Sequence, residues 1–120
     1  MKNEELENKL RKDFAYTKFG DNHFDRVMLG DFKFAKGKAI AIYTRAYETY
    51  SPERDQTYSG LVFTDGEISS RILYDRVEDS AGKMFGPDKD DDNWIKKILK
   101  FDGNTIEYEV KSGKIKETRV

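Results

Sequence analysis

Residues 24–50 read FDRVMLGDFKFAKGKAIAIYTRAYETY and carry the most informative pattern in the chain, because their side chains follow a period of two. Lys36 and Gly37 lie near the middle of this stretch, and a Lys-Gly pair between two alternating runs is typical of a β-hairpin turn. The sequence therefore predicts antiparallel strands over 24–35 and 38–50. A two-residue turn gives the pairs Phe34–Ala39, Phe32–Ala41, Gly30–Tyr43, Met28–Arg45 and Arg26–Tyr47.

Both faces of this predicted hairpin are largely apolar. One face is aromatic and carries the pairs above, and the other is aliphatic. A sheet with one face in water would instead alternate between apolar and polar residues. Each face therefore needs a cover, which closure into a barrel, a second packed sheet or a partner would supply. The aliphatic face consists of Val27, Leu29, Ile40, Ile42 and Ala46.

Three further turn signals follow, at Asp65-Gly66, Asp102-Gly103 and Ser112-Gly113. Two-residue turns there predict that Phe63 pairs with Ile68, Leu99 with Ile106 and Val110 with Ile115. Residues 94–101 also fit helical spacing, and the register of the Asp102-Gly103 turn favours the strand. The predicted strands are 57–64, 67–75, 94–101, 104–110 and 114–119.

The first segment reads as a helix over residues 3–16. Asn3 is a suitable N-cap, and acidic residues precede basic ones, as the helix dipole favours. Leu6, Leu10 and Phe14 form one apolar stripe that must dock on a sheet. We therefore expect a single domain over 1–120 of the mainly β, α+β class. Its N-terminal helix packs on an antiparallel up-and-down meander of about seven strands, over about 24–119, which forms a curved sheet or a partly closed barrel.

Charge and composition exclude several classes of protein. The chain has 22 Lys and Arg against 23 Asp and Glu, so its overall field does not collect nucleic acid or anionic membrane. Its lysines fall on both faces of the predicted hairpins, which is typical of guarded sheet edges. It has no cysteine, which excludes disulfides, thiolate zinc sites and thiol nucleophiles and fits a reducing compartment. With no signal-peptide pattern and no long apolar run, we expect a cytoplasmic protein.

Catalytic and metal-binding patterns are weak. His23 is the only histidine, so it offers one general base and no two-histidine metal site. Asp88, Asp90 and Asp92 have the spacing of a calcium loop, but the glycine and the closing carboxylate of such a loop are missing. We therefore predict no metal, no cofactor and no catalytic residue. A small hydrolase that uses His23 or a pair of acids stays as an alternative.

The strongest candidate site combines tyrosine and arginine on the first hairpin and a later strand. Both residue types are enriched at interaction hot spots. We predict a non-enzymatic protein that binds another macromolecule, such as an immunity protein or a phage-type inhibitor. The alternative is a small-ligand-binding β-barrel with a Tyr/Arg-lined pocket, and self-association would also cover the two apolar faces. The predicted binding residues are Arg26, Tyr43, Arg45, Tyr47, Tyr50 and Arg71.

Overall fold

A computed structural model describes residues 2–15, 26–47, 56–79 and 94–120. The described chain is mainly β with one helix, so the predicted α+β class is confirmed. Every predicted element is present, and the segment that could be read as helix or strand is a strand. The elements are α1 (Asn3–Ala15), β1 (Arg26–Ala35), β2 (Lys38–Tyr47), β3 (Gln56–Thr64), β4 (Arg71–Asp79), β5 (Ile95–Phe101), β6 (Thr105–Val110) and β7 (Ile115–Arg119).

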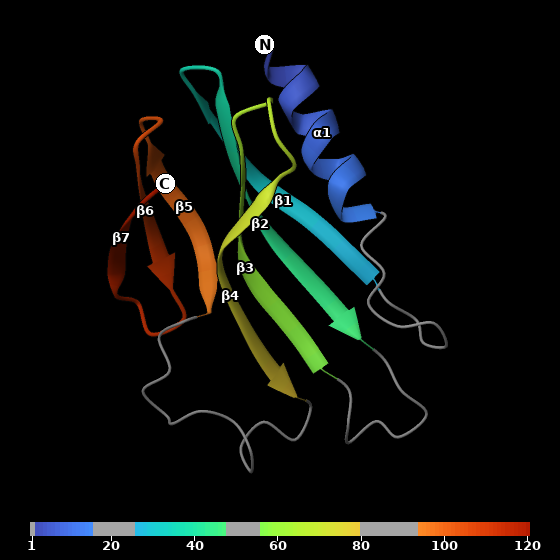
Figure 1. Cartoon of the computed structure of the whole chain (residues 1–120). Coiled ribbons are helices and arrows are strands. Elements are labelled where there is room, and N and C mark those ends of the chain that lie inside the picture. Colours follow the sequence, from blue (N-terminus) through green and yellow to red (C-terminus); the bar gives the residue numbers. More distant parts are fainter. Residues whose placement is uncertain (1, 16–25, 48–55, 80–93) are drawn as a thin grey trace.

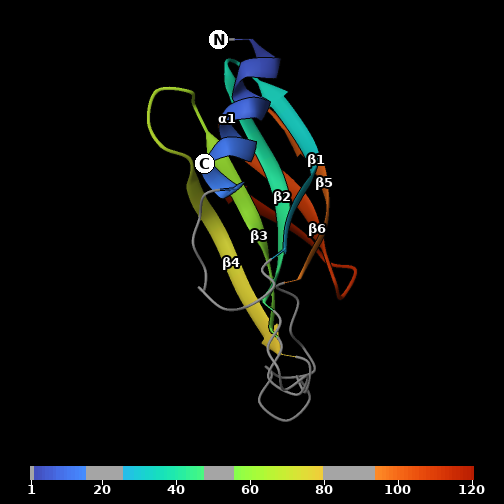
Figure 2. The same ribbon diagram turned by 90° about the vertical axis from the view of Figure 1, so that its right-hand side faces the viewer.

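The seven strands form an antiparallel meander that is divided into two sheets (Figure 1). The first sheet has the order β1-β2-β3-β4, and the second has the order β5-β6-β7. Figure 2 shows that α1 and the second sheet lie on opposite sides of the first sheet. The two sheets are not closed into a barrel, so of the two predicted arrangements the structure has the open one. Within the described residues, no helix has the length and apolarity needed to cross a membrane.

Strand β2 explains why three layers form. Its alanines, Ala39 and Ala41, face α1 and leave room for the helix, whose buried Leu6 and Leu10 pack there. Its isoleucines point the other way, into a second core between the two sheets. The members of that core are Ile40, Ile42, Leu61, Ile95, Ile98, Ile106, Tyr108 and Val110. Small residues on one face and large branched residues on the other thus set which layer lies on each side.

The register of the first hairpin matches the prediction next to the turn and differs from it in residues 26–30 of β1. Near the turn, Phe34 pairs with Ala39 as expected, but a β-bulge between Gly30 and Lys33 inserts an extra residue. Asp31 has a positive φ of 54° in this bulge. As a result Gly30 pairs with Ile42. The predicted pairs Gly30–Tyr43, Met28–Arg45 and Arg26–Tyr47 are therefore wrong.

The bulge also corrects the predicted face of Val27 and Leu29, which the two-residue turn places with Ile40 and Ile42. It reverses the alternation, so that Val27 and Leu29 lie on the α1 side together with Phe32 and Phe34. The opposite face of this half of β1 carries Met28. In the ladder Met28 pairs with Thr44, and Gly30 pairs with Ile42. Val27, Leu29, Phe32 and Phe34 thus face α1, whereas Met28 faces away from it.

The later turns are wider than two residues, so the pairs predicted next to them are wrong. Phe63 pairs with Arg71 rather than Ile68, because a loop occupies residues 65–70. In the next hairpin Phe101, rather than Leu99, pairs with Ile106, because residues 102–105 connect this pair. Two irregularities in β5 then shift the ladder back, so that Ile95 pairs with Val110, as a two-residue turn also predicts. Strand β7 is offset by one residue, so Glu109 takes the place predicted for Val110 opposite Ile115. In the first two of these turns an aspartate side chain, Asp65 or Asp102, accepts hydrogen bonds from backbone N–H groups of the loop, which favours a wider turn.

Candidate functional site

Tyr43 and Arg45, two of the predicted binding residues, lie on the α1 side of the first sheet and are buried. Tyr43 contacts Phe14 of α1, with ring centroids 5.1 Å apart. The Arg45 guanidinium lies 4.4 Å from the ring centroid of Tyr58, and only 8% of the residue is exposed. Cation–π stacking of this kind stabilises a partly desolvated arginine. These two side chains therefore form part of the packing between α1 and the sheet.

Arg71 lies elsewhere. It pairs with Phe63 on the opposite face of the first sheet, and its guanidinium lies 5.0 Å from the Phe63 ring centroid. The structure therefore does not bring Arg71 together with Tyr43 and Arg45.

The other predicted positions are described only in part. In the backbone ladder, Arg26 pairs with Ala46 and Tyr47 with Gln56, at the end of the sheet remote from the β1–β2 turn. The side chains of Arg26 and Tyr47, and Tyr50 as a whole, lie outside the described residues. His23 and the predicted calcium-like loop, 88–93, lie outside them as well.

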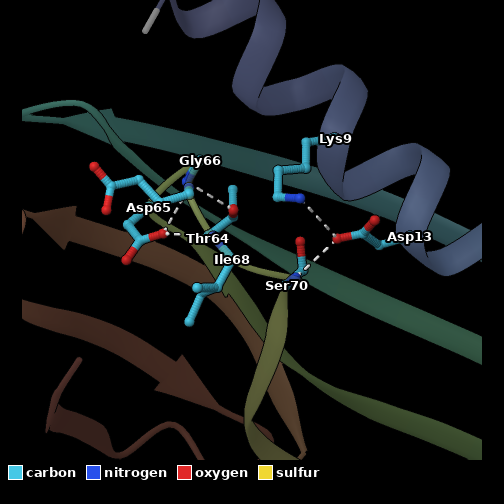
Figure 3. A network of polar contacts seen from close by, with 8 residues as sticks. Lys9, Asp13, Thr64, Asp65, Gly66, Ile68 and Ser70 are labelled. Carbon is cyan, nitrogen blue, oxygen red and sulfur yellow. Dashed lines mark hydrogen bonds and ion pairs between the residues drawn. The ribbon is translucent and has the colours of Figure 1, made fainter.

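The loop between β3 and β4, residues 65–70, is held by its own side chains (Figure 3). The carboxylate of Asp65 accepts a hydrogen bond from the Glu67 N–H at 2.9 Å, and the Ile68 N–H lies 3.5 Å from the same oxygen. The hydroxyl of Thr64 accepts one from the Gly66 N–H at 3.0 Å. Local bonds of this kind fix the backbone without a ladder partner.

The end of the loop is tied to α1. The Asp13 carboxylate accepts a hydrogen bond from the backbone N–H of Ser70 at 2.8 Å. Lys9, one turn earlier in the helix, places its ammonium 3.8 Å from the same carboxylate oxygen. Figure 3 shows this chain of contacts crossing from the helix to the loop. The loop is therefore held both internally and by a second layer of the structure.

The fixed loop presents an exposed apolar residue, Ile68, of which 61% is accessible. Ile68 lines a pocket of about 140 Å³ together with Phe63 and Arg71. We call these three residues the loop site. It combines an apolar side chain, an aromatic ring and a guanidinium over a rigid backbone, which are the components of interaction hot spots.

Charges around the loop site are mixed. The Glu67 N–H lowers the pKa of the Asp65 carboxyl below its usual value, and the nearby Arg71 guanidinium contributes to the same shift. Asp65 is therefore ionised at neutral pH, near the guanidinium of Arg71. A complementary surface would need both a hydrogen-bond donor and an acceptor near an apolar contact.

The predicted binding residues include Arg71 and do not include Ile68. A two-residue turn at Asp65-Gly66 places Ile68 in a strand opposite Phe63. The polar pair Ser69-Ser70 after Ile68 is the signal that could have indicated a longer loop.

The structure can also be compared with two alternative kinds of site, a ligand pocket between the sheets and a metal site. The space between the sheets is filled by buried branched side chains, so a ligand there would have to displace the core. Within the described ranges, no group of three or more His, Asp or Glu residues is placed to hold a metal ion.

Comparison of the chain with protein-family models, with curated proteins and with solved structures finds no significant match.

Proposed function

We propose that this chain is a non-enzymatic protein that binds another protein through the loop site, as an immunity protein or a small inhibitor does. The observation that carries the proposal is the exposure of Ile68 on a loop whose backbone is already fixed by hydrogen bonds. An exposed isoleucine on a rigid loop gains apolar burial on binding and loses little conformational entropy.

The anchoring of the loop to α1 supports the same role. Ser70 is bound by Asp13, so the loop keeps one position relative to the helix and the sheet. Preorganised binding segments favour affinity because less ordering accompanies association. Arg71 stacks on Phe63 beside Ile68, so its guanidinium is held where it can form directional hydrogen bonds with a partner.

A protein partner fits this site better than a small molecule. The pocket beside Ile68 measures about 140 Å³. Pockets that enclose small ligands are typically about 300–1,000 Å³. A volume of this size accommodates one side chain of a partner. The proposal includes a cytoplasmic location, because a chain without cysteine suits a reducing compartment.

The experiment is affinity capture from the cells that make the protein, followed by measurement of the dissociation constant with the purified partner. Ile68→Glu and Arg71→Glu each alter the loop site. We expect each substitution to weaken binding by at least about 30-fold, which is the effect of losing a hot-spot residue. Thermal unfolding checks that both variants remain folded.

Ile115→Glu is the matched control. Ile115 is 62% exposed, almost the same as Ile68, but it lies on β7 in the second sheet. The control should capture the same partner with the affinity of the original chain. Equal binding by Ile68→Glu and the original chain would show that the loop site is not the binding surface.

A further inference from the structure

One edge of the first sheet carries an uncharged, exposed segment, residues 27–30 of β1. Strand β1 is the outer strand of its sheet, and among the described residues it forms a ladder only with β2. Met28 is 67% exposed, the highest value among the large apolar residues described. A Cβ atom placed on Gly30 would meet no atom within 4 Å. This part of the strand is therefore open to an approaching chain.

The α1 side of the same segment is also incompletely covered. Val27 and Leu29 are only partly buried and, with Phe14 and Arg11 of α1, line a pocket of about 230 Å³. Apolar surface is thus exposed on both faces of one short edge, above and below the line of its backbone groups. Unpaired edge backbone next to apolar side chains is a template for pairing with another strand.

The other outer strands differ from this segment. Proteins protect sheet edges with charged side chains and bulges. Strand β4 has an irregularity opposite Leu61 and Val62, and β5 has two. Residues 27–30 contain no charge, and the bulge of β1 begins only after them. The charged residues of the other outer strands are Arg71, Asp75, Arg76, Glu78 and Asp79 in β4, Lys96, Lys97 and Lys100 in β5, and Lys116, Glu117 and Arg119 in β7.

We infer that two copies of this chain pair through β1, antiparallel, about a two-fold axis at Met28. In this register Met28 faces Met28 of the partner subunit, and Val27 faces the partner subunit's Leu29. Gly30 faces the partner subunit's Arg26, so no two like charges are opposed within residues 26–30. The next position in the register would bring two aspartates together, which limits the pairing to this segment. The two four-stranded sheets become one continuous sheet.

The self-complementarity of this register favours a second copy over an unrelated peptide. Each apolar residue of the segment meets another apolar residue, and the α1-side pocket of each copy meets the α1 side of the other. The segment ends at Asp31, whose carboxylate accepts a hydrogen bond from the Ile98 N–H of β5 and so closes the edge there. Pairing is therefore limited to about residues 26–30.

The short length of the paired segment determines how stable the dimer should be. Stable interfaces bury about 1,200–2,000 Å² in total, and so short a strand pair with flanking side chains falls at or below the lower limit. We expect a reversible, concentration-dependent dimer. The loop site is next to β4, the opposite outer strand of the same sheet, so this dimer leaves it accessible.

Sedimentation velocity over a wide concentration series tests the inference. The original chain should approach twice 14.0 kDa at high concentration. Met28→Lys places two ammonium groups opposite each other and should weaken the dimer by about tenfold or more. Ile115→Lys is the control and should leave it unchanged. A chain that stays monomeric throughout, or a dimer that Ile115→Lys dissociates, would overturn the inference.

Single cysteines test the register, because the chain has none of its own. Met28→Cys should form a disulfide between copies on mild oxidation, since the Cα atoms of directly opposed residues in an antiparallel ladder are about 4.5–5.5 Å apart. Val27→Cys and Ile115→Cys should cross-link at least about tenfold more slowly, because disulfides do not form across more than about 7 Å. Equal rates for the three variants would exclude the two-fold axis at Met28. Preferential cross-linking by Ile115→Cys would place the interface on β7 instead.

Discussion

The carboxylate of Asp13 in α1 and the backbone N–H of Ser70 form a hydrogen bond of 2.8 Å between residues 57 positions apart in the sequence. This contact joins the helix to the end of the β3–β4 loop. The helix also contacts the sheet through apolar side chains such as Leu6 and Leu10, and through the Arg11 guanidinium, which lies 4.9 Å from the Phe32 ring centroid. Apolar packing holds the helix to the sheet without strong direction, whereas this bond fixes one point of the loop.

Asp13→Ala removes the acceptor and leaves the Ser70 N–H without it. A hydrogen bond to a charged group contributes about 1.5–3 kcal/mol, and partial solvent exposure of Asp13 lowers this to about 1 kcal/mol. Urea unfolding should show this loss of stability. Lys12→Ala, an exposed neighbour, should change the free energy of unfolding by less than about 0.5 kcal/mol. Equal effects of the two substitutions would contradict the role of the bond.

The same bond predicts a pH dependence. Burial raises the pKa of the Asp13 carboxyl, but the contact with Ser70 and the positive charges of Lys9 and Lys12 outweigh it, so the pKa lies below its usual value. A lowered folded-state pKa stabilises the fold above the unfolded pKa, and the contribution disappears as the pH falls through the folded one. The stability difference between the original chain and Asp13→Asn should therefore be largest near neutral pH and shrink in acid. A stability difference that grows in acid would mean that folding raises the pKa of Asp13 instead of lowering it.

Asp102 in the β5–β6 turn should titrate at unusually low pH. The N–H groups of Thr105 and Asn104, each at 2.8 Å, and the Thr105 hydroxyl at 2.9 Å lower its pKa to about 2. A carboxyl titration followed by NMR should show this midpoint. Thr105→Val removes the hydroxyl and should raise the pKa toward its usual value. The contribution of Asp102 to stability is present above the unfolded pKa and is lost as the pH falls through about 2. An unshifted midpoint would mean that the turn is open in solution.

Substitution by alanine should destabilise the fold at Gly60 and leave its stability almost unchanged at Gly30. At Gly60 a Cβ would lie 2.1 Å from the Tyr74 carbonyl oxygen and 2.7 Å from the Tyr43 ring, and a backbone oxygen cannot move aside alone. Gly60→Ala should lower the free energy of unfolding by roughly 1–3 kcal/mol. Gly30→Ala meets open space and should change it by less than about 0.5 kcal/mol, measured at a concentration where the chain is monomeric. Similar melting temperatures for the two variants would contradict the close approach at Gly60.

The number, order and type of the elements could be predicted from the sequence because they depend on local signals. The stripe of Leu6, Leu10 and Phe14 predicts a helix that ends within one residue of Ala15. The Lys36-Gly37 turn also predicts the register beside it, where Phe34 pairs with Ala39. Such signals act over a few residues and do not need the tertiary structure.

The faces of the strands could not be predicted, because a bulge shifts every later residue to the other side. The bulge at Asp31 is stabilised by a contact with Ile98, 67 residues away, which leaves no mark in the local pattern. The predicted site depended on the faces, and so it grouped Arg71 with Tyr43 and Arg45, although the sheet separates them. Ile68 was missed for the related reason that Asp65 holds a longer loop than its Asp-Gly pair indicates.

Because the bulge at Asp31 adds one residue to β1, the number of residues in this strand decides which of its side chains face the helix. Removing or adding one residue between Leu29 and Lys33 would turn Val27 and Leu29 to the face away from the helix, whereas a change of two residues would keep their orientation. Length variants of this part of the strand in descendants of the chain should therefore come in even steps.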